Sequence, residues 1–214
     1  MNSSEKHLQL RGLYAITQDG LPQAELYEKT EAILANGAQL LQYRDKSADR
    51  SKRLEQALWL KQCCDEFNCL FIINDDIELA DEVSADGVHL GRDDAVYAQA
   101  RAQLGPKAII GLSCYNQMNL AEAAQAMGAS YAAFGACFPS PTKPDAPLAS
   151  LELIQQAKQQ LNIPVCCIGG ITLERAPQLL ESNADMLAVI SNLYSCDHPG
   201  KVARQYRELF HRSQ

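Results

Sequence analysis

The chain has 214 residues, of which 47% are hydrophobic and 21% are charged, and its formal net charge at pH 7 is −7. This composition is typical of a globular protein with a sizeable core, and the acidic balance disfavours nucleic acid or an anionic membrane surface as a partner. No apolar run approaches the roughly 20 residues that span a bilayer, and the N-terminal residues MNSSEKHLQLRG lack the apolar stretch of a secretory signal. We therefore expect a cytoplasmic protein.

Short apolar runs of the kind that form buried strands recur along the chain. They lie near residues 13–17, 39–44, 70–74, 87–90, 108–113, 131–135, 164–169 and 186–191. Helical patterns separate them, such as AELYEKTEAILANGA, which ends in the helix-stop pair Asn36-Gly37. This alternation predicts parallel βαβ units, and therefore an α/β protein with a (β/α)8 TIM-barrel fold and a single domain over residues 1–214. A doubly wound open sheet is the competing architecture, but no G-x-G-x-x-G opens the first helix.

The cysteines are either scattered or adjacent, as in the pairs Cys63-Cys64 and Cys166-Cys167. No C-x-x-C motif occurs, and no histidine lies at zinc-finger spacing from a cysteine. Disulfides are rare in the cytosol, and a free thiol in an apolar run behaves as a small hydrophobe. The sequence therefore predicts reduced, structural thiols.

In a (β/α)8 barrel the active site is built from the loops that follow the strands, so polar residues should gather there. Gln42, Arg44 and Lys46 follow the second run, and the period of a strand places all three on one side. Arginine offers a bidentate fork to phosphate oxygens and lysine a point charge. An ordinary solvated loop is the alternative.

Acidic loops follow the third and fourth runs, as Asn74-Asp75-Asp76 and as Gly91-Arg92-Asp93-Asp94. Neighbouring strands bring such loops side by side, and carboxylates from two loops suit Mg²⁺ shared with a phosphate ligand. Aspartates are also ordinary helix caps, so capping by Asp75 and Asp76 stays open as an alternative.

Hydroxyls and glycines follow the later runs. FPSPTKPDAP, residues 138–147, could be a linker, but a domain boundary there would leave only two strands beyond it, so a βα loop over the barrel mouth is favoured. Gly169-Gly170 fits a phosphate cradle or a tight turn. His89 has no evident nucleophile partner, and we expect it to be enclosed in its strand. Cations, hydroxyls and a metal together indicate phosphate chemistry.

Seven short motifs stand in order at these strand ends: QYRDK (42–46), NDD (74–76), DGVHLGRDD (86–94), GLS (111–113), FPSPTK (138–143), IGGI (168–171) and VIS (189–191). With them the chain resembles the thiamine-phosphate synthase family from about Leu13 to about Ser191. The resemblance implies a (β/α)8 transferase that joins 4-amino-2-methyl-5-(diphosphooxymethyl)pyrimidine to a thiazole phosphate, giving thiamine monophosphate and diphosphate.

The resemblance also implies roles for individual residues. The pyrimidine diphosphate would be held by Gln42, Tyr43, Arg44, Asp45, Lys46, Asn74, Ser113 and Lys143. The thiazole phosphate would be held by Ser140, Pro141, Thr142, Gly170, Ile190 and Ser191. Asp75 and Asp94 would bind one Mg²⁺ per site. Arg44, Lys46, Lys143 and Ser113 would be the catalytic residues, acting on two small phosphorylated substrates, and a homo-oligomer stays open.

The implied chemistry explains why no general base stands out. The thiazole nitrogen attacks with its lone pair, and the pyrimidine amino group can feed electrons to the exocyclic methylene while diphosphate departs, so positioning and charge stabilisation suffice. A thiazole tautomerase-like isomerase, which would need a local acid or base, and a non-catalytic metabolite-binding barrel are the alternatives.

The chain departs from the family pattern at three places. Arg92 stands where the family commonly has Gln, and Ser140 where Thr is usual. After Ser113 the chain reads Cys114-Tyr115-Asn116, whereas many relatives have Thr-His. A role for a histidine in this loop is therefore in doubt.

Overall fold

A computed structural model describes residues 10–91, 93–139 and 147–212 of the chain. Its strands are parallel and close into a barrel in which each pairs with the next in sequence and the last pairs with the first. They are β1 (Gly12–Ile16), β2 (Leu40–Tyr43), β3 (Leu70–Asn74), β4 (Gly87–Leu90), β5 (Ile109–Tyr115), β6 (Tyr131–Phe134), β7 (Val165–Ile168) and β8 (Met186–Val189). The predicted (β/α)8 barrel is confirmed, and the open sheet is excluded because β1 and β8 are hydrogen-bonded.

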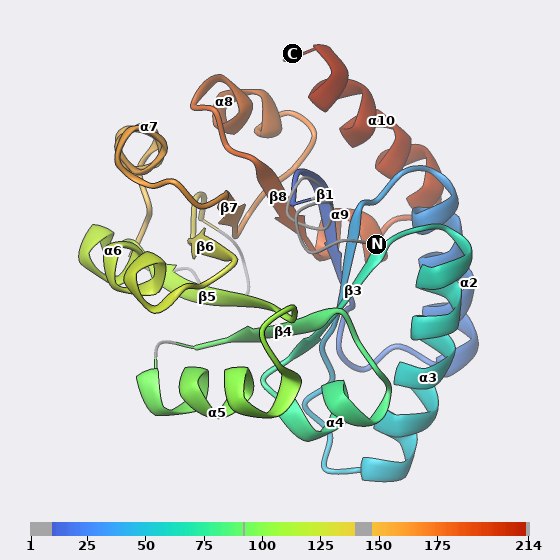
Figure 1. The fold of residues 1–214 in the computed structure, drawn as a ribbon. Coiled ribbons are helices and arrows are strands. Elements are labelled where there is room, and N and C mark those ends of the chain that lie inside the picture. The colour runs from blue at the N-terminus through green and yellow to red at the C-terminus, as the bar shows by residue number, and fades with distance from the viewer. Residues whose placement is uncertain (1–9, 92, 140–146, 213–214) are drawn as a thin grey trace.

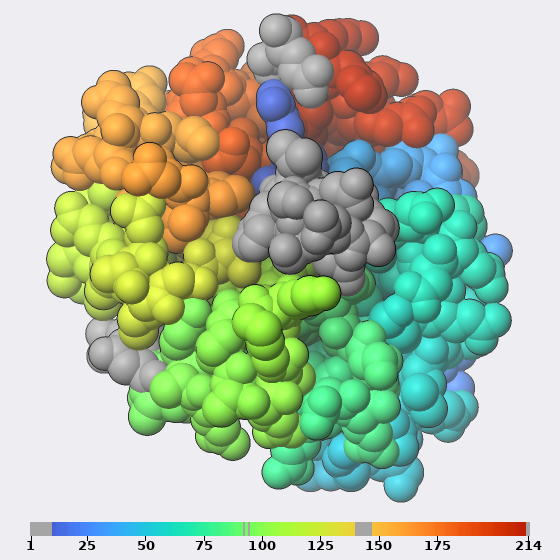
Figure 2. All heavy atoms as spheres, viewed as in Figure 1, coloured from blue at the N-terminus to red at the C-terminus, as the bar shows by residue number. Residues whose placement is uncertain are grey.

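Helices surround the strands as an outer ring (Figure 1). They are α2 (Gln23–Ala35), α3 (Arg50–Glu66), α4 (Ile77–Glu82), α5 (Asp94–Leu104), α6 (Met118–Met127), α7 (Leu151–Gln160), α8 (Ala176–Glu181), α9 (Ser191–Tyr194) and α10 (Pro199–Arg212). The space-filling view shows the colours passing around the rim in chain order, from the blue and cyan of α2 and α3 to the red of α10 (Figure 2). The last helix, α10, packs beside α2 and so closes the ring.

Local signals set several helix boundaries. Asp49 caps α3 by accepting a hydrogen bond from the Lys52 backbone N–H at 3.0 Å, and Ser150 caps α7 in the same way. Gly128 ends α6 in the left-handed conformation that glycine adopts without steric cost. The two N-caps fix where α3 and α7 start, and so how much chain is left for the loops at the barrel mouth, whereas Gly128 ends α6 at the opposite end of the barrel.

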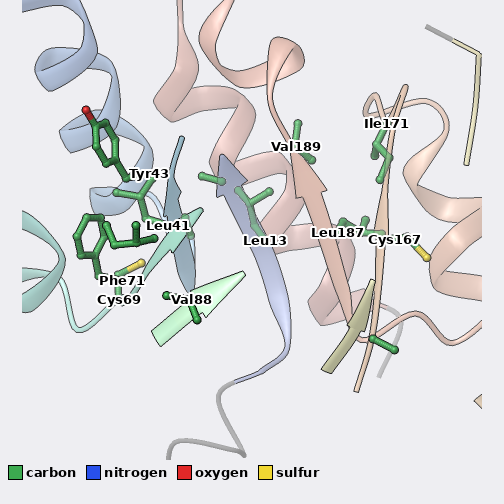
Figure 3. Packing of buried hydrophobic residues seen from close by; sticks show 14 of the residues in the cluster. Leu13, Leu41, Tyr43, Cys69, Phe71, Val88, Cys167, Ile171, Leu187 and Val189 are labelled. Carbon is green, nitrogen blue, oxygen red and sulfur yellow. The ribbon is translucent and has the colours of Figure 1, made fainter. Parts of the chain in front are cut away.

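The core has two layers because successive strand residues point to opposite sides of the sheet. Leu13, Leu41, Phe71 and Leu187 belong to the large cluster between strands and helices, and Figure 3 shows them on the helix-facing side. Alternate residues form a smaller cluster inside the barrel, made of Leu10, Tyr14, Ile16, Leu40, Leu70, Ile72, Ile109, Tyr131, Ala133, Cys166, Met186 and Ala188. The barrel is therefore filled by side chains, as is usual for this fold.

The cysteines are free thiols, as predicted. All are buried except Cys196, which is partly exposed. Within the described residues, no helix is both long enough and apolar enough to cross a membrane.

Candidate active site

The strand β2 sends alternate side chains to the two sides of the sheet. Gln42 points into the barrel, where it is buried, and its Nε2 donates to Tyr14 Oη at 2.8 Å. Tyr43 points outward, toward the helices (Figure 3). Its hydroxyl donates to Gln56 Oε1 of α3 at 2.8 Å. The side chain of Tyr43 therefore belongs to the outer core layer, and only its backbone faces the loop after the strand.

Arg44 and Lys46 are positioned by the loop that follows β1. Thr17 Oγ1 accepts from the Arg44 backbone N–H at 2.8 Å and lies 3.1 Å from the Arg44 carbonyl oxygen. The Arg44 guanidinium forms an ion pair with Asp19, which also accepts from the Lys46 backbone N–H at 3.1 Å. The sequence analysis did not single out Asp19, although it follows the first strand as part of a polar run.

Asp45 is held by its own loop. Its carboxylate accepts from Lys52 Nζ at 2.6 Å and from the Ser47 backbone N–H at 2.6 Å, and its side chain is only 8% exposed. Burial alone would raise the pKa of Asp45, but the hydrogen bonds from Lys52 and Ser47 outweigh it and lower that pKa. The geometry gives Asp45 the task of shaping the β2–α3 loop.

The acidic loop after β3 divides into two functions. Asp76 caps α4 through the Leu79 backbone N–H at 2.9 Å and pairs with Arg53 at 2.9 Å. Among the described helices, none is capped by Asp75, which is exposed, has φ of 62° and accepts from Asn74 Nδ2 at 2.8 Å. The capping alternative therefore holds for Asp76, while Asp75 keeps a carboxylate at the mouth in a backbone conformation that non-glycine residues rarely adopt.

The donor set is compatible with a magnesium ion. Within the described residues no group of three or more histidine, cysteine or acidic side chains could hold a metal. Asp93 caps α5 through the Ala95 backbone N–H at 2.9 Å, and the side chain of Asp94 lies outside what the structure describes, as does Arg92. One exposed carboxylate, Asp75, suits an ion that keeps several waters and takes its other oxygens from substrate phosphates.

His89 is hydrogen-bonded at both ring nitrogens. Its Nδ1 lies 2.9 Å from Tyr131 Oη, and its Nε2 lies 2.9 Å from Ser113 Oγ. Burial lowers the pKa of His89 to about 4, so the ring is neutral at neutral pH and a weak base. The sequence showed no evident nucleophile partner for His89, and the structure places Ser113 Oγ beside it. A nucleophilic serine is still not indicated, because a tyrosine hydroxyl stands where a triad places a carboxylate.

The loops after β6 and β7 are braced by Arg175. Its Nη1 donates to the Gly170 carbonyl at 2.8 Å and to the Pro139 carbonyl at 3.3 Å, and its guanidinium lies over the Phe138 ring. A Cβ on Gly170, whose φ is 64°, would lie 2.6 Å from the Phe138 carbonyl oxygen, so only glycine fits. The sequence alone did not point to Arg175, because nothing local to ITLERAPQ shows that its partners lie on two different loops.

The remaining predicted residues follow β6 and β8 in the sequence. Ile190 and Ser191 come directly after β8, between β1 and β7 in the barrel, and Ser191 opens α9. Ser140, Pro141, Thr142 and Lys143 fall outside the described residues. The described part of the site thus brings Gln42, Arg44, Asn74, Asp75, Ser113 and Gly170 to the carboxyl ends of the strands, the end at which barrel enzymes carry their active sites.

A family model described as thiamine monophosphate synthase matches residues 13–193. The chain is 49% identical over 202 residues to thiamine-phosphate synthase from Thioalkalivibrio sulfidiphilus, covering 94% of this chain and 96% of that protein. The chain belongs to the thiamine monophosphate synthase family. A second member, thiamine-phosphate synthase from Chromobacterium violaceum, is 51% identical over 195 residues, covering 91% of this chain and 94% of the relative.

Solved structures agree with this family assignment. The thiamine phosphate pyrophosphorylase from Pyrococcus furiosus superposes with a TM-score of 0.86 at 30% identity, covering 97% of this chain and 98% of that one. The 3-hexulose-6-phosphate synthase from Salmonella typhimurium, at 14% identity and a TM-score of 0.71, shares the fold alone. Membership in the thiamine monophosphate synthase family therefore extends over the whole barrel.

Proposed function

We propose that this chain is a thiamine-phosphate synthase, a transferase that joins 4-amino-2-methyl-5-(diphosphooxymethyl)pyrimidine and the thiazole phosphate into thiamine monophosphate, with release of diphosphate. The observation that carries the proposal is the identity of about half the residues with named synthases over almost the whole chain. The arrangement of cations, amides and hydroxyls at one end of the barrel supports it, because two anionic substrates must be held there by a protein of acidic overall charge.

The pyrimidine diphosphate would be held by residues after β2, β3 and β5. Gln42 and Ser113 offer uncharged hydrogen-bonding groups from the barrel interior, which suit the pyrimidine ring. Arg44 and Lys46 offer positive charge, which suits the diphosphate. Arg44 would exchange or share its partner Asp19 when the diphosphate binds, which costs little because an exposed ion pair contributes about 0–1 kcal/mol.

Tyr43, Asp45, Asn74 and Lys143 complete the proposed pyrimidine site. Asn74 would act beside Asp75, whose carboxylate it already contacts. Tyr43 and Asp45 would contribute backbone groups of the loop, since their side chains are bound to Gln56 and Lys52. Lys143 would add a further cation for the diphosphate.

One Mg²⁺ would be held by Asp75 and Asp94 at the mouth. When bound, the ion would neutralise charge on the departing diphosphate. Asn74 orients the Asp75 carboxylate through the 2.8 Å contact from Nδ2, and the left-handed backbone at Asp75 fixes where that carboxylate points.

The thiazole phosphate would lie over the loops after β6, β7 and β8, held by Ser140, Pro141, Thr142, Gly170, Ile190 and Ser191. Backbone N–H groups at glycine-rich turns and helix starts suit a phosphate, and this end of (β/α)8 barrels often carries such a cradle. Arg175 holds the Gly170 carbonyl, so it fixes the orientation of this loop.

The proposed reaction needs positioning more than proton transfer. The thiazole nitrogen carries its own lone pair, and C–O cleavage can run ahead of its attack, so the chain must align the two substrates and stabilise the leaving group. The neutral, half-buried His89 is poorly suited to act as a base, which fits a reaction that requires none. Absence of nucleic acid and membrane partners, a homo-oligomer and a cytoplasmic location stay predictions.

The test is to mix the purified full chain with both substrates and Mg²⁺ and to measure thiamine monophosphate. Metal-dependent product supports the proposal. An isomerised thiazole alone would indicate a tautomerase, and saturable binding without turnover would indicate a metabolite-binding barrel.

A matched pair of lysine variants sharpens this assay. Lys143→Ala should lower turnover at least about a hundredfold, because it removes a cation from the leaving group. Lys107→Ala, an exposed lysine in the connection before β5, makes the same change away from the mouth and should leave turnover unchanged. Normal turnover in both variants would contradict the assignment of Lys143.

A further inference from the structure

A continuous chain of hydrogen-bonded side chains runs through the barrel interior. It starts at Gln42 on β2, whose Nε2 donates to Tyr14 Oη on β1. Tyr14 Oη lies 2.9 Å from Tyr131 Oη on β6, and these two strands are not neighbours in the barrel. From Tyr131 the chain continues to His89 and ends at Ser113. It therefore joins two side chains that the proposed function assigns to one substrate.

The barrel makes room for this chain at Gly111. The strand register places Gly111 of β5 between His89 of β4 and Tyr131 of β6. A Cβ on Gly111 would lie 1.9 Å from Tyr131 Cζ and 2.3 Å from its hydroxyl oxygen. Because glycine lacks a Cβ, the rings of His89 and Tyr131 stack against each other over Gly111, with centroids 5.6 Å apart and planes inclined by 17°. The stacking of His89 on Tyr131 therefore depends on one residue from each of the adjacent strands β4, β5 and β6.

Each hydroxyl in this series has one proton, and this limit determines which group donates and which accepts in each hydrogen bond. Burial raises the pKa of Tyr14 and of Tyr131 above the ordinary value, so each keeps its single hydroxyl proton. Gln42 donates to Tyr14 Oη, and the buried Tyr14 proton has an acceptor among these side chains only if it is donated to Tyr131. Tyr131, which then accepts from Tyr14, in turn donates its own proton to His89 Nδ1. A neutral ring that accepts at Nδ1 carries its proton on Nε2 and donates it to Ser113.

This order of donors and acceptors determines which hydrogen-bonding group stays free on Gln42 and which stays free on Ser113. Gln42 uses its amide nitrogen inside the chain and keeps Oε1, an acceptor, while Ser113 accepts from His89 and keeps its O–H, a donor. No other hydrogen bond of either free group is found within the described residues. Reversing every bond of the chain would exchange the two roles. One end of the series therefore keeps a free acceptor and the other end a free donor.

We propose that Tyr14, Tyr131 and His89 are positioning residues that set this order of donors and acceptors, so that the site selects a 4-aminopyrimidine over its 4-oxo analogue. The inference rests on the proposed function. A 4-aminopyrimidine presents an amino donor to Gln42 and a ring-nitrogen acceptor to Ser113. The 4-oxo analogue replaces that donor by an acceptor and places a proton on the neighbouring ring nitrogen, so its edge opposes the chain. These three side chains do not need to touch the substrate.

The first test needs no substitution and no substrate. Nitrogen-15 NMR of the labelled, unmodified chain, with His89 assigned through the backbone, reports the tautomer of its ring. We expect the proton on Nε2, and a proton on Nδ1 would overturn the proposed order of donors and acceptors. Because this readout is independent of turnover, it stands even if the chain makes no thiamine monophosphate, a result that would overturn the proposed function instead.

The second test measures selectivity by calorimetry with the 4-amino pyrimidine diphosphate and its 4-oxo analogue, in the presence of Mg²⁺. The unmodified chain should bind the 4-amino form at least about tenfold more tightly, since a mismatched buried hydrogen bond costs at least this much. The variants Tyr131→Phe and Tyr14→Phe keep the aromatic rings but interrupt the series of hydrogen bonds between Gln42 and Ser113. Each should reduce that ratio to about threefold or less, because the end groups can then reorient.

The matched control is Tyr194→Phe. Tyr194 is as buried as Tyr14 and Tyr131, and its hydroxyl lies 2.9 Å from Thr30 Oγ1 in the outer layer, away from the interior chain. This variant should lose stability but keep the selectivity ratio. An unchanged ratio in both Tyr131→Phe and Tyr14→Phe, or an equal loss in Tyr194→Phe, would overturn the proposal.

Discussion

Arg44 is one of the cations proposed to hold the diphosphate, and its partner is Asp19 of the loop after β1. Both side chains of this ion pair are partly exposed, so the pair is weak and open to exchange. Asp19 also accepts from the Lys46 backbone N–H and so shapes the same loop. Asp19 therefore both positions Arg44 and competes with the proposed diphosphate for its positive charge.

The substitution Asp19→Asn separates these two effects. Asparagine keeps an oxygen for the Lys46 N–H but removes the charge, so the KM for the pyrimidine diphosphate should fall about threefold at low salt and less at high salt. Steady-state kinetics at two ionic strengths measure this. Asp65→Asn, which removes the same charge from an exposed pair with Lys61 on α3, is the control and should leave KM unchanged.

Asp75 combines strain with a functional role, and the substitution Asp75→Gly tests both. Glycine adopts the φ of 62° without steric cost, so the free energy of unfolding should stay level or rise by up to about 1 kcal/mol. Turnover should fall at least about a hundredfold, because the proposed metal carboxylate is gone.

Denaturant unfolding and the synthase assay on the same preparation provide the two readouts for Asp75→Gly. The neighbouring Asp76→Ala should do the opposite, losing about 1 kcal/mol with its helix cap while keeping most turnover. If Asp75→Gly and Asp76→Ala changed stability and turnover in the same way, turnover would depend on the conformation of the loop rather than on the Asp75 carboxylate.

At the scale of elements, the loops after β6 and β7 are held together by one side chain. Arg175 donates to a carbonyl on each loop and lies over Phe138, so it braces Gly170 against the segment that leads toward the proline-rich stretch. Backbone bonds add to this bracing, because the Phe138 N–H donates to the Gly169 carbonyl at 3.0 Å and the Cys137 N–H donates to the Ile168 carbonyl at 2.9 Å. The brace ties the cradle proposed for the thiazole phosphate to the loop that carries its hydroxyls.

Arg175→Met should loosen this brace while keeping most of the apolar stem. The KM for the thiazole phosphate should rise about fivefold to tenfold, since a charge-assisted hydrogen bond contributes roughly 1.5–3 kcal/mol and part of it positions the loop. The KM for the pyrimidine diphosphate should change by less than about twofold. Arg175→Lys keeps the charge but loses the fork; full activity in that variant would show that charge, and not bracing, is what Arg175 supplies.

At the scale of the whole molecule, barrel closure controls the packing of the interior. Gly111→Ala would place a methyl group 1.9 Å from Tyr131 Cζ, and overpacking of a closed interior costs about 1–3 kcal/mol. We expect a fall in unfolding free energy of that size, measured in denaturant. Gly91→Ala, where a Cβ meets nothing within 4 Å, should be neutral; a similar loss at both positions would contradict this packing account.

Much of the fold was predictable from the sequence. Apolar runs alternating with helical patterns indicate βαβ units because each strand of a covered parallel sheet must be apolar on both sides. The polar residues after each run marked the mouth, because in this fold the loops at one end of the strands form the site. Gln42, Arg44, Asn74, Asp75 and Ser113 were predicted in this way, and the structure places them at the carboxyl ends of β2, β3 and β5.

Other parts of the site could not be predicted from local patterns. Tyr14 and Tyr131 read as ordinary strand residues, and their contact exists only because the closed barrel brings β1 and β6 face to face across its interior. The partners of His89 and Arg175 likewise come from other strands and loops. Asp19 was overlooked because a lone aspartate after a strand has no local signature apart from its later partner, Arg44.

The sequence by itself therefore determined the order of strands and helices, the barrel and the chemical character of its mouth, since these depend on periodicity and composition within short windows. Only the tertiary structure decided which aspartate caps a helix and which stays free, which cation is already paired, and that hydrogen bonds connect Gln42 to Ser113. The physical reason is range: a hydrogen bond requires its two atoms within about 3 Å, and residues distant in sequence reach that separation only when the sheet closes.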